Sequence, residues 1–459
     1  ARMFKQVGGA CVLTSLTTFV GFASLVMVPS NTIRQFGFST AAGVASALLL
    51  SVLLIPIFLQ WLHNRGKAIA GQAVASASAE RIAGCCLGWA LARPKTVVLL
   101  TICLLVVCAI RSTGLTLDPD LTKRFSKRHQ ASTSADFFIE RFGGFNSLEF
   151  VITGPREHTF APDSLRAMLH FGELCKQEPT VKSVVSVAEV IREFLTRLKP
   201  YDNSDGVPES VKHTSAVIGL LGSADSAGLS ALLPDGHDET RILIQVEETS
   251  YMKLLELSEK LDQHAQTAFG GRLSYSEKGA APLVGRAVRE IIRGHLDGFI
   301  FCFTAIIVLI VVGIRSWQLG WISIIPNLLP LLTLGGLISL SYESVDSDIL
   351  AVATLGLGLA VDDTIHFMSR FKIELSRGVD VAEALVCTMR HTGVAIIRTT
   401  LILSLGFLPF ALSGYWSIRM LGTYLVGVLF AALLADLLVL PALLKIAYRV
   451  RPSTPKTAD

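Results

Sequence analysis

Charged residues are scarce in this sequence: Asp, Glu, Lys and Arg make up 17% of its 459 residues, against roughly a quarter in an average soluble domain. Hydrophobic residues make up 51%, and the mean hydropathy is +0.54. Water cannot solvate such an excess of apolar side chains, so a soluble globular protein is excluded and a lipid bilayer is the expected solvent. The net charge of +4 is small, and we expect no nucleic-acid partner.

Cysteines that could pair or bind metal are also lacking. The long polar stretch at 112–295 holds only Cys175, so it cannot form an internal disulfide. The others lie in or beside apolar segments, where cysteine behaves as a small hydrophobe: Cys11, Cys85, Cys86, Cys103, Cys108, Cys302 and Cys387. No spacing indicates a zinc site, and no nucleophile–base arrangement or phosphate loop indicates an enzyme. We therefore expect neither a cofactor nor catalysis.

What the sequence does contain is eight apolar segments long enough to cross a bilayer. They lie at 10–28, 34–61, 94–111, 296–314, 319–341, 348–369, 393–413 and 418–446. The stretch between the third and the fourth is too hydrophilic for lipid. Its alternating patterns predict strands at 148–153, 181–187, 241–246 and 272–276 and helices at 162–176, 188–198 and 251–269. The predicted fold is a polytopic α-helical membrane protein with an α/β domain of ferredoxin-like βαβ units.

The distribution of basic residues predicts the orientation of these spans. The connection between spans two and three is basic, with Arg65, Lys67, Arg81, Arg93 and Lys95 against the single acid Glu80. The short loops on the opposite side, at 29–33, 342–347 and 414–417, are nearly free of lysine. Because basic loops stay in the cytoplasm, both termini are expected there and the 112–295 domain is expected outside.

An internal repeat organises the chain. At a constant offset of 385 positions, Gly21-Phe22 falls on Gly406-Phe407, Ile33-Arg34 on Ile418-Arg419 and Pro56 on Pro441. The first two spans are therefore expected to close an earlier repeat, whose remaining part would precede this C-terminal portion. The predicted divisions are 1–62 for those two spans, 63–93 for a cytoplasmic linker, 94–111 for the first span of the second repeat, 112–295 for the outer domain, 296–446 for a five-span bundle and 447–459 for a cytoplasmic tail.

The sixth span carries two adjacent acids, Asp362 and Asp363. At 1.5 Å per residue they lie about 20 Å along the helix from Asp348. An ionised carboxylate there costs at least a few kcal/mol, and a neighbouring acid makes ionisation harder still. The pair is therefore expected to hold protons near neutral pH and to release them when its surroundings change, as a proton relay requires. The alternative is a purely structural pair.

Residues around the pair are candidates for the same relay. His366 shares its helix face one turn on, although it could simply mark the cytoplasmic end of the span. Gly356 and Gly358 leave a groove for a neighbouring helix.

On span seven, Arg398 could supply a countercharge to the pair, although snorkelling to the headgroups is the favoured alternative. Thr399 and Thr400 could bridge the carboxylates or bond back to their own helix. Asp436 in span eight and Asp297 at the head of span four are weaker candidates.

These motifs resemble those of the resistance–nodulation–division (RND) superfamily. Gly358-Leu-Ala-Val-Asp362-Asp363 is similar to its Gly-x-x-x-Asp-Asp motif. Span five, with Pro326, Asn327 and Pro330, and span seven, with Thr399-Thr400 and Gly406, resemble it too. The branch that the chain resembles comprises the MMPL-type and hopanoid-exporter-like permeases, with their sterol-sensing relatives.

The resemblance implies twelve spans, of which these eight would be the last, with the N-terminal half as a missing partner. It also implies a bacterial inner membrane, a periplasmic outer domain and proton-driven export of lipids or other hydrophobic molecules. A homo-oligomer or a periplasmic partner is left open. Two other functions on the same scaffold are a Patched-like sterol or lipid sensor and a protein-translocation auxiliary.

Overall fold

The structure is a computed structural model, and it describes residues 8–64, 77–117, 130–142, 146–198, 205–224, 226–234, 238–247, 250–341, 344–345 and 348–448. Most of the predicted tail at 447–459 and most of the predicted loop at 342–347 lie outside these residues. The chain divides into two compact units: Ala1–Leu117 with Glu290–Asp459, and Asp118–Arg289.

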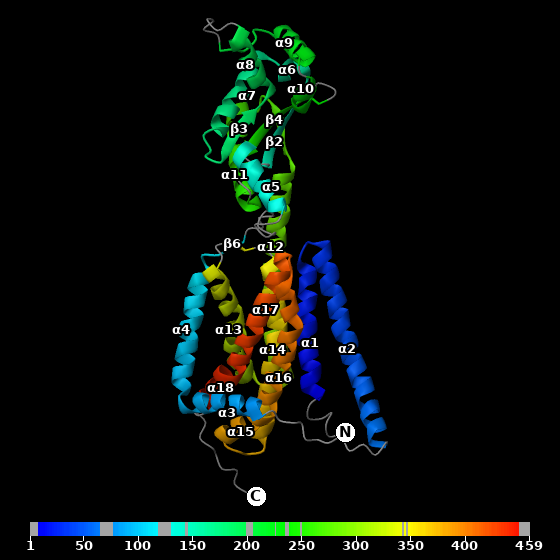
Figure 1. The fold of residues 1–459 in the computed structure, drawn as a ribbon, viewed down its shortest axis with the longest axis vertical. Coiled ribbons are helices and arrows are strands. Elements are labelled where there is room, and N and C mark those ends of the chain that lie inside the picture. Colours follow the sequence, from blue (N-terminus) through cyan, green and yellow to red (C-terminus); the bar gives the residue numbers. More distant parts are fainter. Residues whose placement is uncertain are drawn as a thin grey trace. The chain divides into compact units, whose positions relative to one another are not determined.

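In the described part of the chain, eight helical segments are long and apolar enough to cross a bilayer, and Figure 1 shows them. Their elements are α1 (Gly9–Ala23) with the 3₁₀ turn η2 (Ser24–Met27), α2 (Asn31–Asn64), α4 (Pro94–Ser112), α12 (Ala280–Ile314), α13 (Trp317–Ser341), α14 (Asp348–Ser376), α15 (Val381–Thr388) with η4 (Met389–Gly393), α16 (Val394–Phe407) and η5 (Leu408–Leu412), and α17 (Trp416–Leu434) with η6 (Ala435–Val439) and α18 (Leu440–Tyr448). The prediction of a polytopic helical membrane protein with a small α/β domain is confirmed.

The two repeat-related hairpins have the same order of elements. In each, a helix ends in a 3₁₀ turn and a second helix returns beside it: α1, η2 and α2 in one, α16, η5 and α17 in the other. A glycine allows the close approach in both. A Cβ at Gly37 would lie 2.9 Å from the Cβ of Leu25, and one at Gly422 would lie 2.8 Å from the Cβ of Phe410. Gly422 lies 385 positions after Gly37, and Phe410 lies 385 positions after Leu25. The repeat therefore extends to individual contacts.

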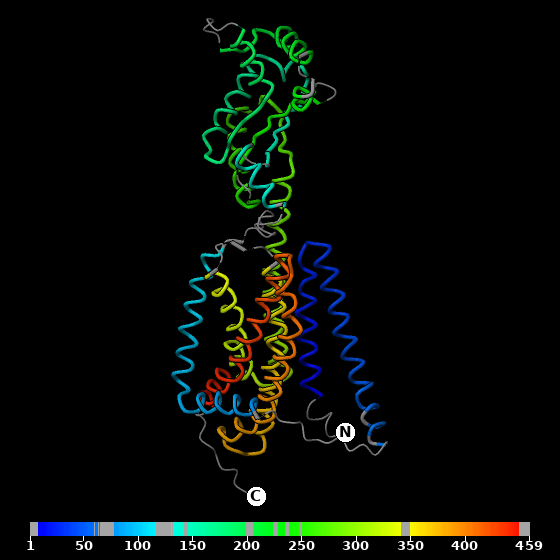
Figure 2. The backbone as a smooth tube through the Cα atoms, viewed as in Figure 1, coloured from blue at the N-terminus to red at the C-terminus, as the bar shows by residue number. Residues whose placement is uncertain are grey.

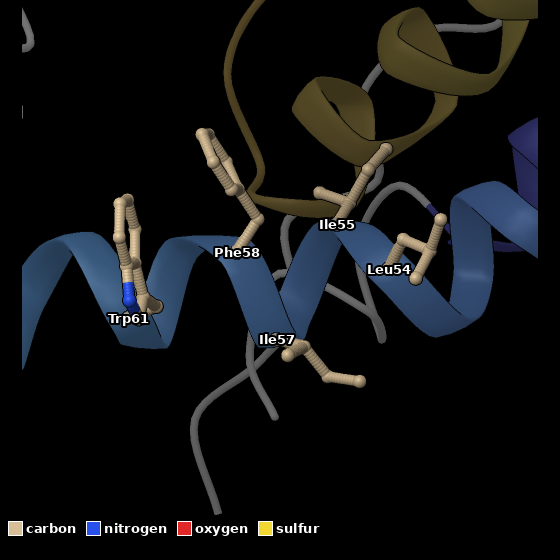
Figure 3. Close-up of a pocket in the computed structure, with 5 residues that line it drawn as sticks. All are labelled: Leu54, Ile55, Ile57, Phe58 and Trp61. Atoms are coloured by element: carbon tan, nitrogen blue, oxygen red, sulfur yellow. The ribbon is translucent and has the colours of Figure 1, made fainter.

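Helix α2 presents an apolar face that no other described helix covers. Leu54, Ile57, Phe58 and Trp61 are each about half exposed or more, and Figure 3 shows them with Ile55 along a shallow apolar depression. The rings of Phe58 and Trp61 stack, with centroids 5.7 Å apart. Such a surface is unfavourable in water and is typical of a helix that faces lipid.

Helix α3 (Ala77–Ala92) lies within the segment 63–93 that the sequence analysis treats as a linker. Its buried residues recur at helical spacing and pack against η4, η6, α16 and α18; they are Ala79, Ala83, Leu87 and Ala90. The ammonium group of Lys445 donates to the carbonyl of Leu91, near the end of α3, at 2.6 Å. This helix is therefore an integral part of the first unit.

The second unit is an α/β domain, built around one antiparallel sheet with strand order β3-β4-β2-β5. Its elements are α5 (Gln130–Phe142), β2 (Asn146–Thr153), α6 (Arg156–Thr159), α7 (Pro162–Cys175), β3 (Val181–Val185), α8 (Val187–Leu198), α9 (Val211–Ala224), α10 (Ser226–Leu232), β4 (Glu239–Val246), α11 (Tyr251–Phe269) and β5 (Ser274–Lys278). Strands β2 and β3, joined through α6 and α7, have β4 between them, and strands β4 and β5, joined through α11, have β2 between them; each intervening strand runs the other way, as the ferredoxin-like arrangement requires. Helices α5, α6, α9 and α10 were not predicted.

The core of the second unit lies between this sheet and helices α7 and α11. In β4 every second residue from Thr240 to Val246 is buried, the period of a strand with one covered face. The rings of Phe150, Phe171 and Phe269 meet with centroids 5.0 and 5.1 Å apart. Figure 2 traces the chain through this unit, coloured cyan to green.

Cys175 at the end of α7 should be almost inert to alkylation. Its side chain is fully buried, and burial, with the charge of Glu178 as a second cause, raises the pKa of the thiol to about 12. Because an ordinary thiol titrates near 8.5 and only the thiolate reacts, N-ethylmaleimide at neutral pH should modify Cys175 about 1,000-fold more slowly in folded than in denatured protein. Mass spectrometry of both forms checks this, with the exposed Cys85 as the control; comparable rates for Cys175 would contradict it.

Candidate functional site

The acid pair lies near the midpoint of α14, the helix that packs against α1, α13 and α17 in the first unit. Gly356 and Gly358 precede Asp362 on the same helix by six and four residues. A Cβ at Gly358 would lie 3.7 Å from the Cα of Gly21 in α1, and a Cβ at Gly356 would lie 2.7 Å from a methyl group of Val428 in α17. Gly358 therefore allows α1 to approach α14, and Gly356 allows α17 to do so. At Gly21 and Gly358, α1 crosses α14 with backbone against backbone.

This crossing brings two threonines of α1 to Asp362. Thr18 donates to one carboxylate oxygen at 2.9 Å and Thr17 to the other at 3.2 Å. Each hydroxyl also has the carbonyl of Thr14 as an alternative acceptor, at 3.0 and 2.7 Å. A hydroxyl has a single hydrogen. The threonines can therefore both donate to an ionised Asp362, or both donate back to their own helix while one of them accepts from a protonated Asp362.

Asp363 points to a different helix. The hydroxyl of Thr399 in α16 donates to the Asp363 carboxylate and also reaches the carbonyl of Ile396 at 2.9 Å. Thr399 therefore lies within reach of both acceptors considered from the sequence, the acid pair and its own helix. Thr400 is buried on the same helix, and Arg398 is half-buried there.

The other predicted residues lie on helices α13, α14 and α16. His366 is half-buried on α14. Pro326 and Pro330 lie inside α13. A Cβ at Gly406 would meet no atom within 4 Å.

A second polar cluster follows directly on α14. Thr364 is buried, and its hydroxyl oxygen lies 2.7 Å from Oδ1 of Asp436 in η6 and 3.2 Å from Oδ1 of Asn327 in α13. Asp436 and Asn327 are themselves 1% and 4% exposed. Three consecutive residues, Asp362 to Thr364, thus make polar contacts in three directions.

Thr17, Thr18 and Thr364 were not predicted from the sequence. The signal available for the first two was a run of hydroxyls, Thr14, Ser15, Thr17 and Thr18, in an otherwise apolar span. The repeat could not identify them, because at the offset of 385 Thr17 and Thr18 fall on Ile402 and Leu403.

Loss of both hydroxyls on α1 should slow any process that needs Asp362 to change its protonation state. Valine has nearly the shape of threonine, so the Thr17→Val/Thr18→Val double variant keeps the packing and removes both donors. A hydrogen bond to a charged group contributes about 1.5–3 kcal/mol, so we expect a fall of about tenfold or more in proton-coupled flux. The Thr17→Ser/Thr18→Ser variant should restore it. Equal flux in the valine and wild-type proteins would contradict the assignment.

The fold and the site together define a multi-pass membrane protein with a ferredoxin-like domain and carboxyls held by hydroxyls inside its helical bundle. Residues 299–458 match the model of the MMPL family. The predicted resemblance to MMPL-type members of the RND superfamily is therefore confirmed.

Known proteins with similar sequences are membrane proteins too. YdfJ of Bacillus subtilis is 22% identical over 475 residues, which cover all of this chain and 59% of YdfJ. The membrane protein MJ1562 of Methanocaldococcus jannaschii is 28% identical over 144 residues, 31% of this chain and 37% of that protein.

The fold is similar to that of SecDF from Thermus thermophilus, a translocon-associated membrane protein. The crystal structure of SecDF matches with a TM-score of 0.55 at 13% identity, over 98% of this chain and 49% of the SecDF chain. This chain covers less than two thirds of the length of each of the three proteins.

Proposed function

We propose that this chain takes part in proton-driven transport of lipids or other hydrophobic molecules out of the inner membrane, with the second unit in the periplasm. The MMPL match supports a membrane transporter. The observation that carries the proton coupling is the acid pair on α14, with Asp362 bound by hydroxyls of α1 and Asp363 by a hydroxyl of α16. In this proposal the chain moves its cargo without changing any covalent bond.

The contacts explain how proton binding could move helices. Thr17 and Thr18 both donate to Asp362 when it is ionised; when Asp362 is protonated, their hydrogens return to Thr14, and one hydrogen bond from the neutral carboxyl replaces two to a charged one. Uptake of a proton thus weakens the attraction between α1 and α14. Because these helices meet at Gly21 and Gly358 without intervening side chains, a small shift of one against the other meets little steric resistance.

Transport of a lipophilic dye tests this function. Cells that produce the full chain are loaded with Nile red, and efflux is followed with and without a protonophore. We expect faster efflux than in cells with an empty vector, and the protonophore should abolish the difference. Efflux that is no faster than the empty-vector control, or that is insensitive to the protonophore, would contradict the proposal for this class of substrate.

A second candidate is a role in protein translocation, which the similarity to SecDF over nearly the whole chain favours. In that case cells depleted of the protein should accumulate unprocessed secretory precursors, and dye efflux should not respond to production of the chain. Pulse-chase labelling of a secreted protein distinguishes the two functions.

A further inference from the structure

The carboxyl of Asp436 is the most deeply buried acid in the described part of the first unit. Its residue is 1% exposed, in the segment that ends the last span. An ionised carboxylate without a full set of donors is costly in such a place. Among the described residues, the hydroxyl of Thr364 is the donor within hydrogen-bond distance, at 2.7 Å. Asp436 is therefore favoured in its protonated form. Whenever it is ionised, the groups around it must rearrange.

The hydrogens of the cluster can be arranged in two ways. Thr364 has one hydroxyl hydrogen but two acceptor oxygens within reach, on Asp436 and Asn327. With Asp436 protonated, its O–H donates to Thr364, and Thr364 donates to Oδ1 of Asn327. With Asp436 ionised, Thr364 donates to Asp436, and the amide of Asn327 turns so that its N–H donates to Thr364. Both arrangements satisfy the threonine.

The backbone at Asp436 departs from the regular α-helix. Asp436 lies in η6, a π-helical turn between α17 and α18. Such turns carry one residue more than the regular helix and occur often at functional sites. Here the turn directs Asp436 at α14, where Thr364 lies next to Asp363 in the chain.

The charged groups around Asp436 leave Asp363 as its electrostatic partner. The charge of Asp363 acts on Asp436, while α13 contributes no titratable residue. Arg390 and His391 of η4 are exposed, and Lys445 of α18 is bound to the carbonyl of Leu91. The further titratable groups on the packed helices are Asp348, Asp362, His366, Arg370, Lys372 and Glu374 of α14, Lys95, Cys103, Cys108 and Arg111 of α4, Arg419 and Tyr424 of α17, Tyr448 of α18, and Glu80, Arg81, Cys85 and Cys86 of α3.

We propose that Asp436 is a second proton-carrying station of the bundle, which exchanges a proton with Asp363 while Thr364 and Asn327 reverse the direction of their hydrogen bonds. In the exchange the O–H bond of Asp436 breaks and one forms on the Asp363 carboxylate, directly or through water, so that one negative charge moves between them. Two like charges that act on one another in this way are unfavourable, so the two acids do not ionise together. This inference deepens the proposed function. It rests on that function only in assuming that the exchanged proton drives transport.

Infrared spectroscopy of the full chain in vesicles of phosphatidylethanolamine and phosphatidylglycerol tests the exchange without transport. Protonated carboxyls give C=O stretching bands, and ¹³C-labelled aspartate assigns them. We expect Asp436→Asn to remove one band that titrates in the wild type. It should also move the titration of the band that Asp363→Asn removes by about one pH unit toward lower pH, because a second negative charge no longer opposes ionisation.

Two variants of Thr364 separate exchange from a structural role. Thr364→Val should shift the frequency and the titration of the Asp436 band, and Thr364→Ser should restore both. Asp297 of α12, a weaker candidate from the sequence, is exposed in the structure. It therefore supplies the matched control, since Asp297→Asn should change neither band.

The outcomes distinguish this inference from the proposed function. An Asp436 band that persists at every pH at which the bundle stays folded, or an Asp363 band that is indifferent to Asp436→Asn, would overturn the exchange even if dye efflux is normal. Coupled titration of the two bands supports the exchange even if dye efflux fails.

Discussion

Replacement of either acid of the pair on α14 by its amide should reduce proton-coupled dye efflux to background. Asn keeps the size of Asp and can hold the same hydroxyl contacts, but it cannot release a proton. Proton transfer by a positioned side chain typically contributes about 100-fold or more to a rate. We therefore expect both Asp362→Asn and Asp363→Asn to lower efflux by at least about 100-fold, while the protein still inserts into the membrane.

The control for this experiment is Asp297→Asn, because Asp297 is an exposed acid in another span, α12. Amounts of each variant in the membrane fraction are compared by immunoblot, so that loss of activity is separated from loss of protein. Undiminished protonophore-sensitive efflux in both single variants would rule out a proton relay through the pair. Equal loss in the Asp297 variant would indicate a general effect of removing charge from the spans.

The spans could be predicted because each is a local property of the sequence. About 20 consecutive apolar residues need no partner to be recognised, and all eight predicted spans recur as helices in the described chain. The position of the acid pair within its span followed in the same way, from the rise of 1.5 Å per residue. The ferredoxin-like order of strands was predicted for a similar reason, since its units alternate with a clear period.

The partners of the acids could not be predicted, because they depend on which helices meet. Thr17 and Asp362 are 345 positions apart, and no local pattern relates them. The sequence analysis placed the hydroxyl partners on span seven, where the structure supports a contact between Thr399 and Asp363. The α1 contact depends on the Gly21–Gly358 crossing, a feature of packing between helices.

The π-helical turns η4 and η6 were missed for a related reason. An extra residue in a helix leaves the apolar character of the segment unchanged, so hydropathy carries no sign of it. The turn η6 nevertheless decides where Asp436 points. That residue was noted from the sequence as a weaker candidate, and its contact with Thr364 is made from this irregular turn.

The two hairpin glycines should be among the least replaceable residues of the membrane unit. A Cβ at Gly422 would lie 2.4 Å from the backbone nitrogen of Ala411 and 2.7 Å from the carbonyl carbon of Phe410. At the related Gly37 it would lie 2.8 Å from the carbonyl oxygen of Phe22. These are backbone atoms, so no side chain can rotate away. Overpacking of this kind costs about 1–3 kcal/mol, and we expect Gly422→Ala and Gly37→Ala to lower the thermal stability of the purified protein.

Each helix carries its own matched control for this prediction. A Cβ at Gly427 in α17 or at Gly43 in α2 would meet no atom within 4 Å. Because alanine is favoured over glycine inside a helix by about 1 kcal/mol, Gly427→Ala and Gly43→Ala should leave stability unchanged or raise it. The fraction of monodisperse protein after heating in detergent measures all four variants. If the four behave alike, helix propensity alone governs these positions, and the close contacts in the two hairpins do not hold the helices together.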